Sequence, residues 1–116
     1  MPLRMAPILI AALVCISASP LRAQNDAVIE QRGRTILTDN CSRCHAVGRS
    51  GSSPHREAPL FRTLGQRYPI DTLAETLAEG LFTGHPDMPE FVFEIRDVRA
   101  ILAYLQSIQG SRTGPR

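Results

Sequence analysis

The chain has 116 residues, of which 43% are hydrophobic and 21% are charged, and its formal net charge is +2. This length suits a single small domain, and so small a charge gives no indication of nucleic-acid binding. Its three cysteines are too few for a disulfide-rich framework, because only two of them lie beyond the first 23 residues.

The first 23 residues have the layout of a secretory signal peptide. Arg4 supplies a positive charge, residues 8–16 form an unbroken apolar run of nine, and the helix-breaking Pro20 and the small Ala23 follow. A helix that spans a membrane needs roughly 20 apolar residues, so a retained membrane anchor is the weaker interpretation. We expect a signal peptide at 1–23.

Cleavage after Ala23 would leave a mature domain at 24–116 in the periplasm, without a stable membrane anchor. Leu21 stands where the peptidase prefers a small residue, so the cut could fall a few residues away. Cys15 is a weak candidate for lipid attachment, because it lies inside the apolar run and no small residue directly precedes it.

The charges of the mature chain are segregated along the sequence. Its 93 residues include 11 arginines, no lysine and 11 acidic residues, so it is formally neutral. Residues 71–97 hold seven acids and one arginine. Residues 40–70 hold one acid and five arginines, namely Arg43, Arg49, Arg56, Arg62 and Arg67. This pattern predicts a dipolar molecule.

The first predicted helix leads up to Cys41. Ile29, Gly33, Ile36 and Leu37 recur at helical spacing and form one face. A glycine inside a helix costs about 1 kcal/mol relative to alanine, so we expect another element to approach closely at Gly33.

A C-x-x-C-H signature of c-type haem attachment follows, in Cys41-Ser42-Arg43-Cys44-His45. Two thiols separated by two residues at a bent helix end can each add to one vinyl group of the same porphyrin. The next residue, His45, then lies under the iron as its proximal ligand. The signature therefore predicts one haem c, attached covalently through Cys41 and Cys44.

Three other interpretations of the two cysteines stay open. A thioredoxin-like redox pair needs a strand-helix-strand context, and no alternating apolar pattern precedes Cys41. A zinc site needs two further ligands, for which His55 and His85 are available, although their spacing is not typical of zinc ligands. The last interpretation is a chance match within a structural helix.

Residues 46–68 are rich in Gly, Ser, Pro and Arg and show no sustained periodicity. An irregular loop of this length is uncommon in a small domain, and a mature chain of this size is near the limit for a core made of protein alone. A loop that wraps a large apolar cofactor would account for both. His55, within this loop, is expected to be merely solvated.

Two further helices are predicted in the second half of the chain. The first carries apolar residues at Ile70, Leu73 and Leu77 and ends at Gly80. The second has a continuous apolar stripe of Val98, Ile101, Leu102, Leu105 and Ile108. Gly110 is expected to end it.

Met88 lies between these helices in a polar segment bracketed by prolines, Gly84-His85-Pro86-Asp87-Met88-Pro89. A lone methionine is usually core filler, but core methionines seldom occupy such a segment. Met88 is therefore the predicted distal ligand of the haem iron. His85 is the rival candidate, and its alternative role is a hydrogen bond to nearby backbone or to a haem propionate.

In order and spacing, these pieces resemble a class I c-type cytochrome over about residues 26–110. The resemblance rests on Gly33-x-x-Ile36-Leu37-x-x-x-Cys41-x-x-Cys44-His45, Ala58-Pro59-Leu60, Gly84-His85-x-x-Met88-Pro89-x-Phe91 and Ala100-Ile101-Leu102-Ala103-Tyr104-Leu105. It implies an all-α fold in which three to five helices wrap around one covalent haem.

The resemblance also implies two contacts. The first and last helices cross, with Gly33 allowing Tyr104 to come close, and the backbone carbonyl of Pro59 accepts a hydrogen bond from the ring of His45. Such a bond orients the ring and raises the basicity of the ligand.

The chain has no tryptophan, which many members of the resembled family place near a haem propionate. Arg62, Tyr68 and His85 are the candidates to replace it.

A haem held by His45 and Met88 predicts a periplasmic one-electron carrier rather than an enzyme. Its expected partners are a dehydrogenase or quinol-oxidising complex as donor, a terminal oxidase or reductase as acceptor, and the haem attachment machinery. A haem subunit of a periplasmic dehydrogenase complex and a gas-binding or sensor haem protein stay open as alternatives. As one hypothesis, the basic residues between 43 and 67 surround the exposed haem edge and steer an acidic partner. The alternative is that these arginines are merely solvated or bind the haem propionates.

Overall fold

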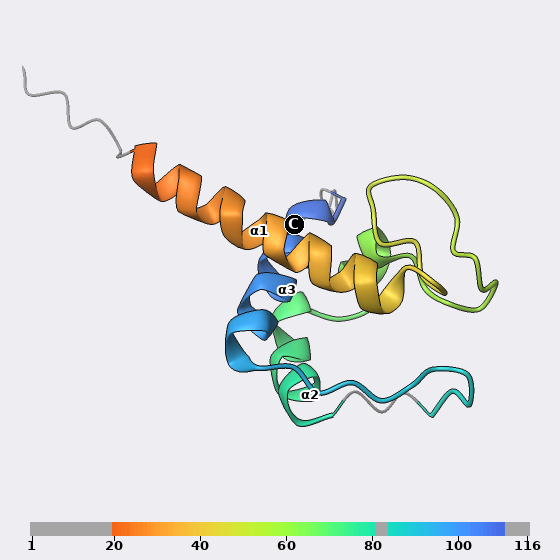
Figure 1. The fold of residues 1–116 in the computed structure, drawn as a ribbon. Coiled ribbons are helices and arrows are strands. Elements are labelled where there is room, and N and C mark those ends of the chain that lie inside the picture. The colour runs from red at the N-terminus through yellow and green to blue at the C-terminus, as the bar shows by residue number, and fades with distance from the viewer. Residues whose placement is uncertain (1–19, 81–83, 111–116) are drawn as a thin grey trace, which may run out of the picture.

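The computed structural model describes residues 20–80 and 84–110, so residues 1–19 of the expected signal peptide lie outside the described residues. In chain order the elements are helix α1 (Pro20–Cys41), the short 3-10 helices η1 (Phe61–Gln66) and η2 (Ile70–Thr72), helix α2 (Leu73–Glu79) and helix α3 (Ile95–Ile108) (Figure 1). The described ranges contain no strand. The predicted all-α fold of three to five helices is therefore confirmed.

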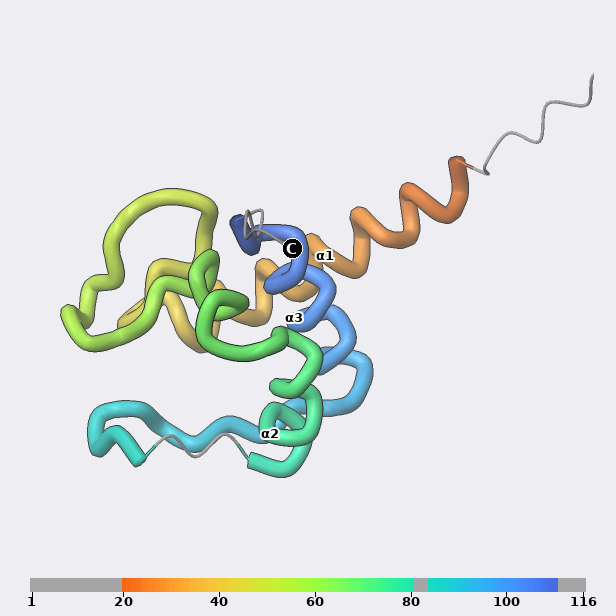
Figure 2. Tube along the Cα trace, turned by 180° about the vertical axis from the view of Figure 1, so that it is seen from behind, coloured from red at the N-terminus to blue at the C-terminus, as the bar shows by residue number. Residues whose placement is uncertain are grey.

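Two loops extend to the same side of these helices, as the opposite views of Figures 1 and 2 show. The upper loop, residues 42–60, follows α1. The lower loop, residues 84–94, lies beyond α2 and leads into α3. None of the described helices is long and apolar enough to span a membrane.

Helix α1 begins at Pro20, which the sequence suggested as a helix breaker. Proline is favoured at the first position of a helix, because its missing N–H has no intrahelical partner there in any case. The buried residues of α1, Gly33 and Leu37, both lie downstream of residue 23. A mature chain that starts at residue 24 would therefore keep the part of α1 that packs.

The close approach expected at Gly33 is present, and it comes from α3. A Cβ atom built on Gly33 would lie 1.9 Å from the carbonyl oxygen of Ala100 and 2.9 Å from the Cβ of Tyr104. The backbones of the two helices thus touch at a point where no other residue type fits. Arg32 supports the crossing from outside, because its guanidinium pairs with Asp97 at 2.5 Å.

The predicted apolar face of α1 is only partly correct. Leu37 is buried in the core, and Ile36 packs against it from a partly buried position. Ile29, by contrast, is 42% exposed. Ile29 borders a surface pocket between α1 and α3, and the part of α1 that precedes it extends beyond the other helices (Figure 1).

The last helix provides half of the buried residues of the core. Val98 and Ile101 are the most deeply buried large side chains among the described residues, at 1% and 0% exposed. Leu102, predicted in the same stripe, is only partly buried against this core.

Helix α3 ends at Ile108, and the backbone is already extended at Gln109, where φ is −65° and ψ is 136°. The sequence pattern predicted that the helix would end at Gly110, and it ends two residues earlier. The side chain of Gln109 donates to the carbonyl of Phe61 at 2.9 Å and accepts from the N–H of Gly65 at 2.8 Å, which joins η1 to the end of α3.

The middle helix ends as predicted. Gly80 follows α2 with a φ of +133°, a value that side chains rarely allow. A Cβ atom at Gly80 would also lie 2.6 Å from the carboxylate of Glu90, so the glycine makes room for the lower loop.

The sequence indicated an irregular loop over residues 46–68, but the segment is not irregular throughout. Its last part forms η1, in which Phe61 and Leu64 are buried. Two apolar residues three positions apart eclipse each other in a 3-10 helix, so this short helix buries both on one side. The pattern is too short to register as a periodicity.

Replacing Gly33 by alanine should destabilise the protein by about 2 kcal/mol or more, because the new methyl group overlaps the carbonyl of Ala100 and forces the helices apart. Denaturant unfolding followed by circular dichroism measures the change. Gly48→Ala is the matched control, since a Cβ atom there meets nothing within 4 Å. Equal stability of the two variants would contradict the proposed crossing.

Candidate functional site

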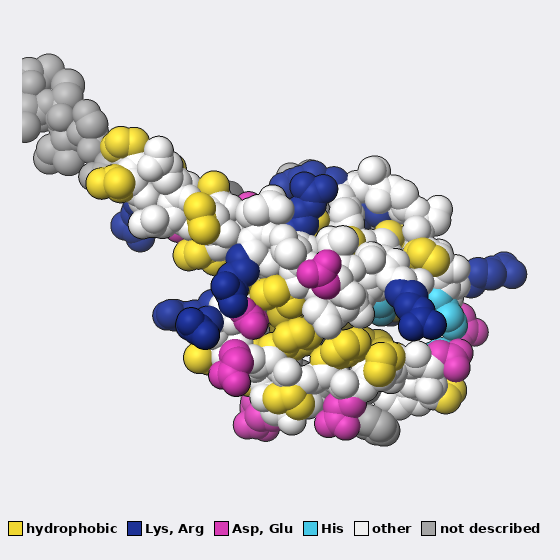
Figure 3. All heavy atoms as spheres, in the orientation of Figure 1, with side chains coloured by type: hydrophobic (Ala, Val, Ile, Leu, Met, Phe, Trp, Pro, Cys, Tyr) yellow, Lys and Arg dark blue, Asp and Glu magenta, His cyan; other side chains and the backbone are white. Residues whose placement is uncertain are grey.

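A cavity of about 840 Å³ lies between the two loops, with the helices at its back. Its walls are mainly apolar, and the helices contribute Leu37 from α1, Leu77 from α2 and Ile101 from α3. Figure 3 shows hydrophobic side chains gathered in the hollow between the upper and lower parts of the molecule. The volume falls within the range of about 300–1,000 Å³ that is typical of sites for small molecules and cofactors.

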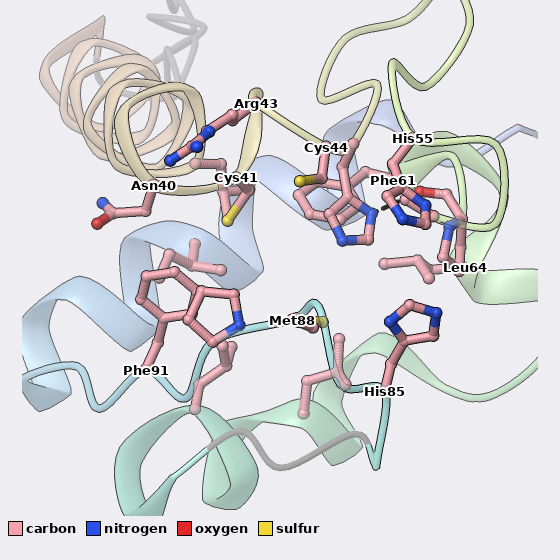
Figure 4. A pocket seen from close by; sticks show the side chains of 18 of the residues that line it. Asn40, Cys41, Arg43, Cys44, His55, Phe61, Leu64, His85, Met88 and Phe91 are labelled. Carbon is pink, nitrogen blue, oxygen red and sulfur yellow. Dashed lines mark hydrogen bonds between the residues drawn. The ribbon is translucent and has the colours of Figure 1, made fainter.

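The structure brings all five predicted site residues to this one cavity, namely Cys41, Cys44, His45, Pro59 and Met88. In Figure 4 the two cysteines lie along one side of the cavity, and Met88 lies in the space facing them. The cysteines come from the end of α1 and the bend after it, and Met88 comes from the lower loop.

A tight bend after α1 places the two cysteines and the histidine together. The N–H groups of Cys44 and His45 both donate to the carbonyl of Cys41, at 3.1 and 2.9 Å. The upper loop then folds back, because the N–H of His55 donates to the carbonyl of Cys44 at 3.1 Å. The backbone thus holds both thiols and the imidazole at the edge of the cavity.

The ring of His45 is held by the contact that the family resemblance implied. Its Nδ1 lies 2.8 Å from the carbonyl oxygen of Pro59, and because a carbonyl can only accept, Nδ1 must be the donor. The neutral ring then carries its lone pair on Nε2, the atom left to bind a metal. Phe61 packs against the ring with the centroids 4.7 Å apart.

The thiol of Cys41 has little thiolate character to offer. Burial, reinforced by the neighbouring Cys44, raises the pKa of Cys41 to about 11. Thiolate is the form that binds zinc and attacks disulfides, so the neutral Cys41 thiol argues against a zinc site or a redox pair. The described residues also lack the strands that a thioredoxin-like pair requires.

The lower loop turns at Met88 and is tied to α2 beyond it. The N–H of Met88 donates to the carbonyl of His85 at 3.1 Å, which forms a turn, and the N–H of Phe93 donates to the carbonyl of Leu77 at 2.9 Å. The second bond ties the loop to α2. Met88 is therefore presented to the cavity by a segment that is fixed to the helical core.

His55 and His85 face each other at the rim of the cavity (Figure 4). Their rings meet edge to face with centroids 5.4 Å apart. His85 binds Glu57 at 2.9 Å, and His55 lies 3.4 Å from a carboxylate oxygen of Asp87. The expectation that His55 is merely solvated is therefore wrong, because the lower loop packs against it. The two histidines are far apart in the sequence, so the sequence pattern did not indicate this contact.

The three candidates for a propionate partner differ in position. Tyr68 lines the cavity. Arg62 donates to the carbonyl of Gly51 at 2.8 Å, and its buried Nη1 has no hydrogen-bond partner within the described residues. His85 is already engaged by Glu57. Arg62 does not line the cavity, whereas Tyr68 and His85 do, so these two are the candidates placed to meet a group bound there.

Sequence reasoning missed several residues of the site. Phe61, which packs on the ring of His45, is one of them. Glu57 and Asp87 at the rim were read only as charges. The sequence does contain a pattern that could have identified these two acids. Each of them follows a histidine by two residues, in His55-x-Glu57 and His85-x-Asp87.

An all-α domain with a C-x-x-C-H bend and a methionine on one apolar cavity has the architecture of a c-type cytochrome. The comparison with protein families agrees. The model described as "Cytochrome C oxidase, cbb3-type, subunit III" matches residues 29–105, and the chain belongs to this family of cytochrome c domains. No curated protein and no solved structure matches the chain. The domain is a haem-binding, electron-transfer domain that works with redox partners.

Proposed function

We propose that the mature protein is a periplasmic one-electron carrier that holds a single haem c through Cys41 and Cys44, with His45 and Met88 as axial ligands. One observation carries this proposal: both thiols, the oriented imidazole of His45 and the sulfur-bearing Met88 line the same cavity. These are the residue types that c-type haem uses for attachment and ligation.

The residues around the cavity suit such a cofactor. The apolar walls match the porphyrin faces. Bound haem supplies an iron that exchanges one electron between its ferrous and ferric forms. The chain holds both ligands still, His45 through the carbonyl of Pro59 and Met88 through the anchored lower loop. Fixed ligands reduce the rearrangement that opposes electron transfer.

A thioether ligand opposite histidine raises the reduction potential of a haem. The protein would therefore accept electrons from a dehydrogenase or a quinol-oxidising complex and pass them to a terminal oxidase or reductase. The haem attachment machinery is the remaining partner, because thioether links are made after secretion.

A second candidate is a haem subunit within a larger redox complex. The matching family is named for a subunit of a cytochrome c oxidase, and a periplasmic dehydrogenase is the other complex that the sequence left open. A subunit should copurify with its catalytic partner at constant ratio, whereas a free carrier should separate from it.

Met88→Ala should remove the distal ligand and with it the sulfur-to-iron absorption band of the oxidised protein. The reduction potential should fall on the order of 0.1 V, within the range of roughly 0.8 V over which axial ligands move haem potentials. Visible spectroscopy and a redox titration of protein matured in a periplasm measure both changes.

His85→Gln is the discriminating variant for this prediction, since His85 is the rival ligand. The band should survive in it and disappear in Met88→Ala. The opposite result would assign the sixth position to His85. Rapid binding of carbon monoxide by the ferrous wild type would instead support a gas-binding protein.

Replacing both Cys41 and Cys44 by serine should abolish covalent attachment. Acid extraction of the denatured wild type should leave its porphyrin on the chain, and the double variant should release all of it. Each single variant keeps one thiol and should retain haem on a denaturing gel stained for haem. Release of porphyrin from the wild type would refute the attachment.

Electron exchange should slow as ionic strength rises, because charged faces steer partners over distances of about a Debye length, roughly 10 Å at 0.1 M salt. Figure 3 shows arginines mainly over the upper part of the molecule and acidic side chains mainly over the lower part. Arg43 is exposed and lines the cavity, so Arg43→Gln should weaken the salt dependence measured by stopped flow. An electron-exchange rate that does not change with salt concentration would contradict electrostatic steering.

A further inference from the structure

The rim of the cavity holds two copies of the same short pattern, one in each loop. In the upper loop the pattern is His55-x-Glu57, and in the lower loop it is His85-x-Asp87. The contacts are reciprocal, because each histidine pairs with the acid of the other loop. Four side chains that could bind a metal therefore meet where the two loops approach each other.

The spacing within this cluster is close to that of a metal site. One ligand atom from each of His55, His85 and Asp87 lies within 4.8 Å of the others. Two atoms that bind a tetrahedral zinc ion at about 2.1 Å are about 3.4 Å apart, and the His55–Asp87 pair already lies at 3.4 Å. Small side-chain rotations would bring the third atom to the same separation.

Glu57 is placed to supply a fourth ligand. Its carboxylate lies 2.9 Å from Nε2 of His85. A bound metal would replace the 2.9 Å contact between His85 and Glu57, together with the two 3.3 Å hydrogen bonds that the backbone N–H groups of Glu57 and Asp87 donate to the Nδ1 atoms of the histidines. The side chains of both histidines are about one-third exposed, at 33% and 37%, so an ion can enter from solvent.

The charge of the cluster favours a cation over a haem propionate. Two carboxylates at this rim would repel a third carboxylate at close range. Two imidazoles with one or two carboxylates are instead a donor set that zinc accepts, whereas Mg²⁺ and Ca²⁺ prefer sites made of oxygen alone.

We propose that His55, His85 and Asp87, with Glu57 as a fourth ligand, form a binding site for a divalent zinc-like cation. This site is separate from the haem ligands His45 and Met88 and from both cysteines. An ion bound there joins the upper loop to the lower loop across the rim of the haem cavity.

Zinc is the probe of choice because it does not change oxidation state, and any spectral response then reports structure alone. Ferric holoprotein should bind one Zn²⁺ per chain in a calorimetric titration, and its thermal midpoint should rise. His55→Gln and His85→Gln should each weaken zinc binding ~10-fold or more, since even residues that only support a metal ligand contribute about 10–100-fold to affinity.

Glu75→Gln is the matched control, because it removes an exposed carboxylate of α2 that does not line the cavity, and it should bind zinc as the wild type does. Mg²⁺ should produce neither heat of binding nor a thermal shift. The variants' far-ultraviolet circular dichroism shows whether each has folded. Zinc binding that is absent in the wild type, or unchanged in both histidine variants, would overturn the proposal.

The outcome is distinguishable from that of the haem assignment. Zinc binding is read by calorimetry, whereas ligation by Met88 is read by the sulfur-to-iron band, which should persist when zinc is bound. Loss of that band on adding zinc would mean that the ion displaces the lower loop rather than joining it to the upper loop, which also overturns the proposal.

Discussion

The contact between the backbones of α1 and α3 at Gly33 is the constraint on which the remaining structure depends. Because the C-x-x-C-H bend directly follows α1, the angle and depth of this crossing determine where the two thiols and His45 face. Helix α3 carries Ile101 at the back of the cavity, so the same crossing places the apolar wall. The hydroxyl of Tyr104 extends the contact to the upper loop through the carbonyl of Val47.

The cavity explains how so small a domain can be stable. A chain of this length buries a modest apolar surface, and here many of the apolar side chains turn toward a hollow rather than toward each other. A porphyrin that filled this space would add buried apolar contacts to the core. The long upper loop follows from the same fact, because a loop with few apolar residues of its own can cover the edge of a large apolar group.

The lower loop has two roles that depend on each other. It presents Met88 to the cavity, and through His85 and Asp87 it meets His55 and Glu57 of the upper loop at the rim. Its bond to Leu77 fixes its far end to α2. The position of a candidate iron ligand is thus held by contacts at both ends, and the rim cluster is one of them. A cation at the rim would act on the loop that carries Met88 through His85 and Asp87.

The sequence by itself determined what depends on neighbours in the chain. The C-x-x-C-H bend, the helical periodicities of α2 and α3, the stop at Gly80 and the unusual setting of Met88 are all local, and each could be predicted. Only the tertiary structure decided that Ile29 is exposed, that Phe61 and Leu64 form a buried turn and that His55 meets His85. Those outcomes depend on which segments become neighbours in space. That choice follows from the helix crossing and the loop paths, which periodicity along a single segment does not encode.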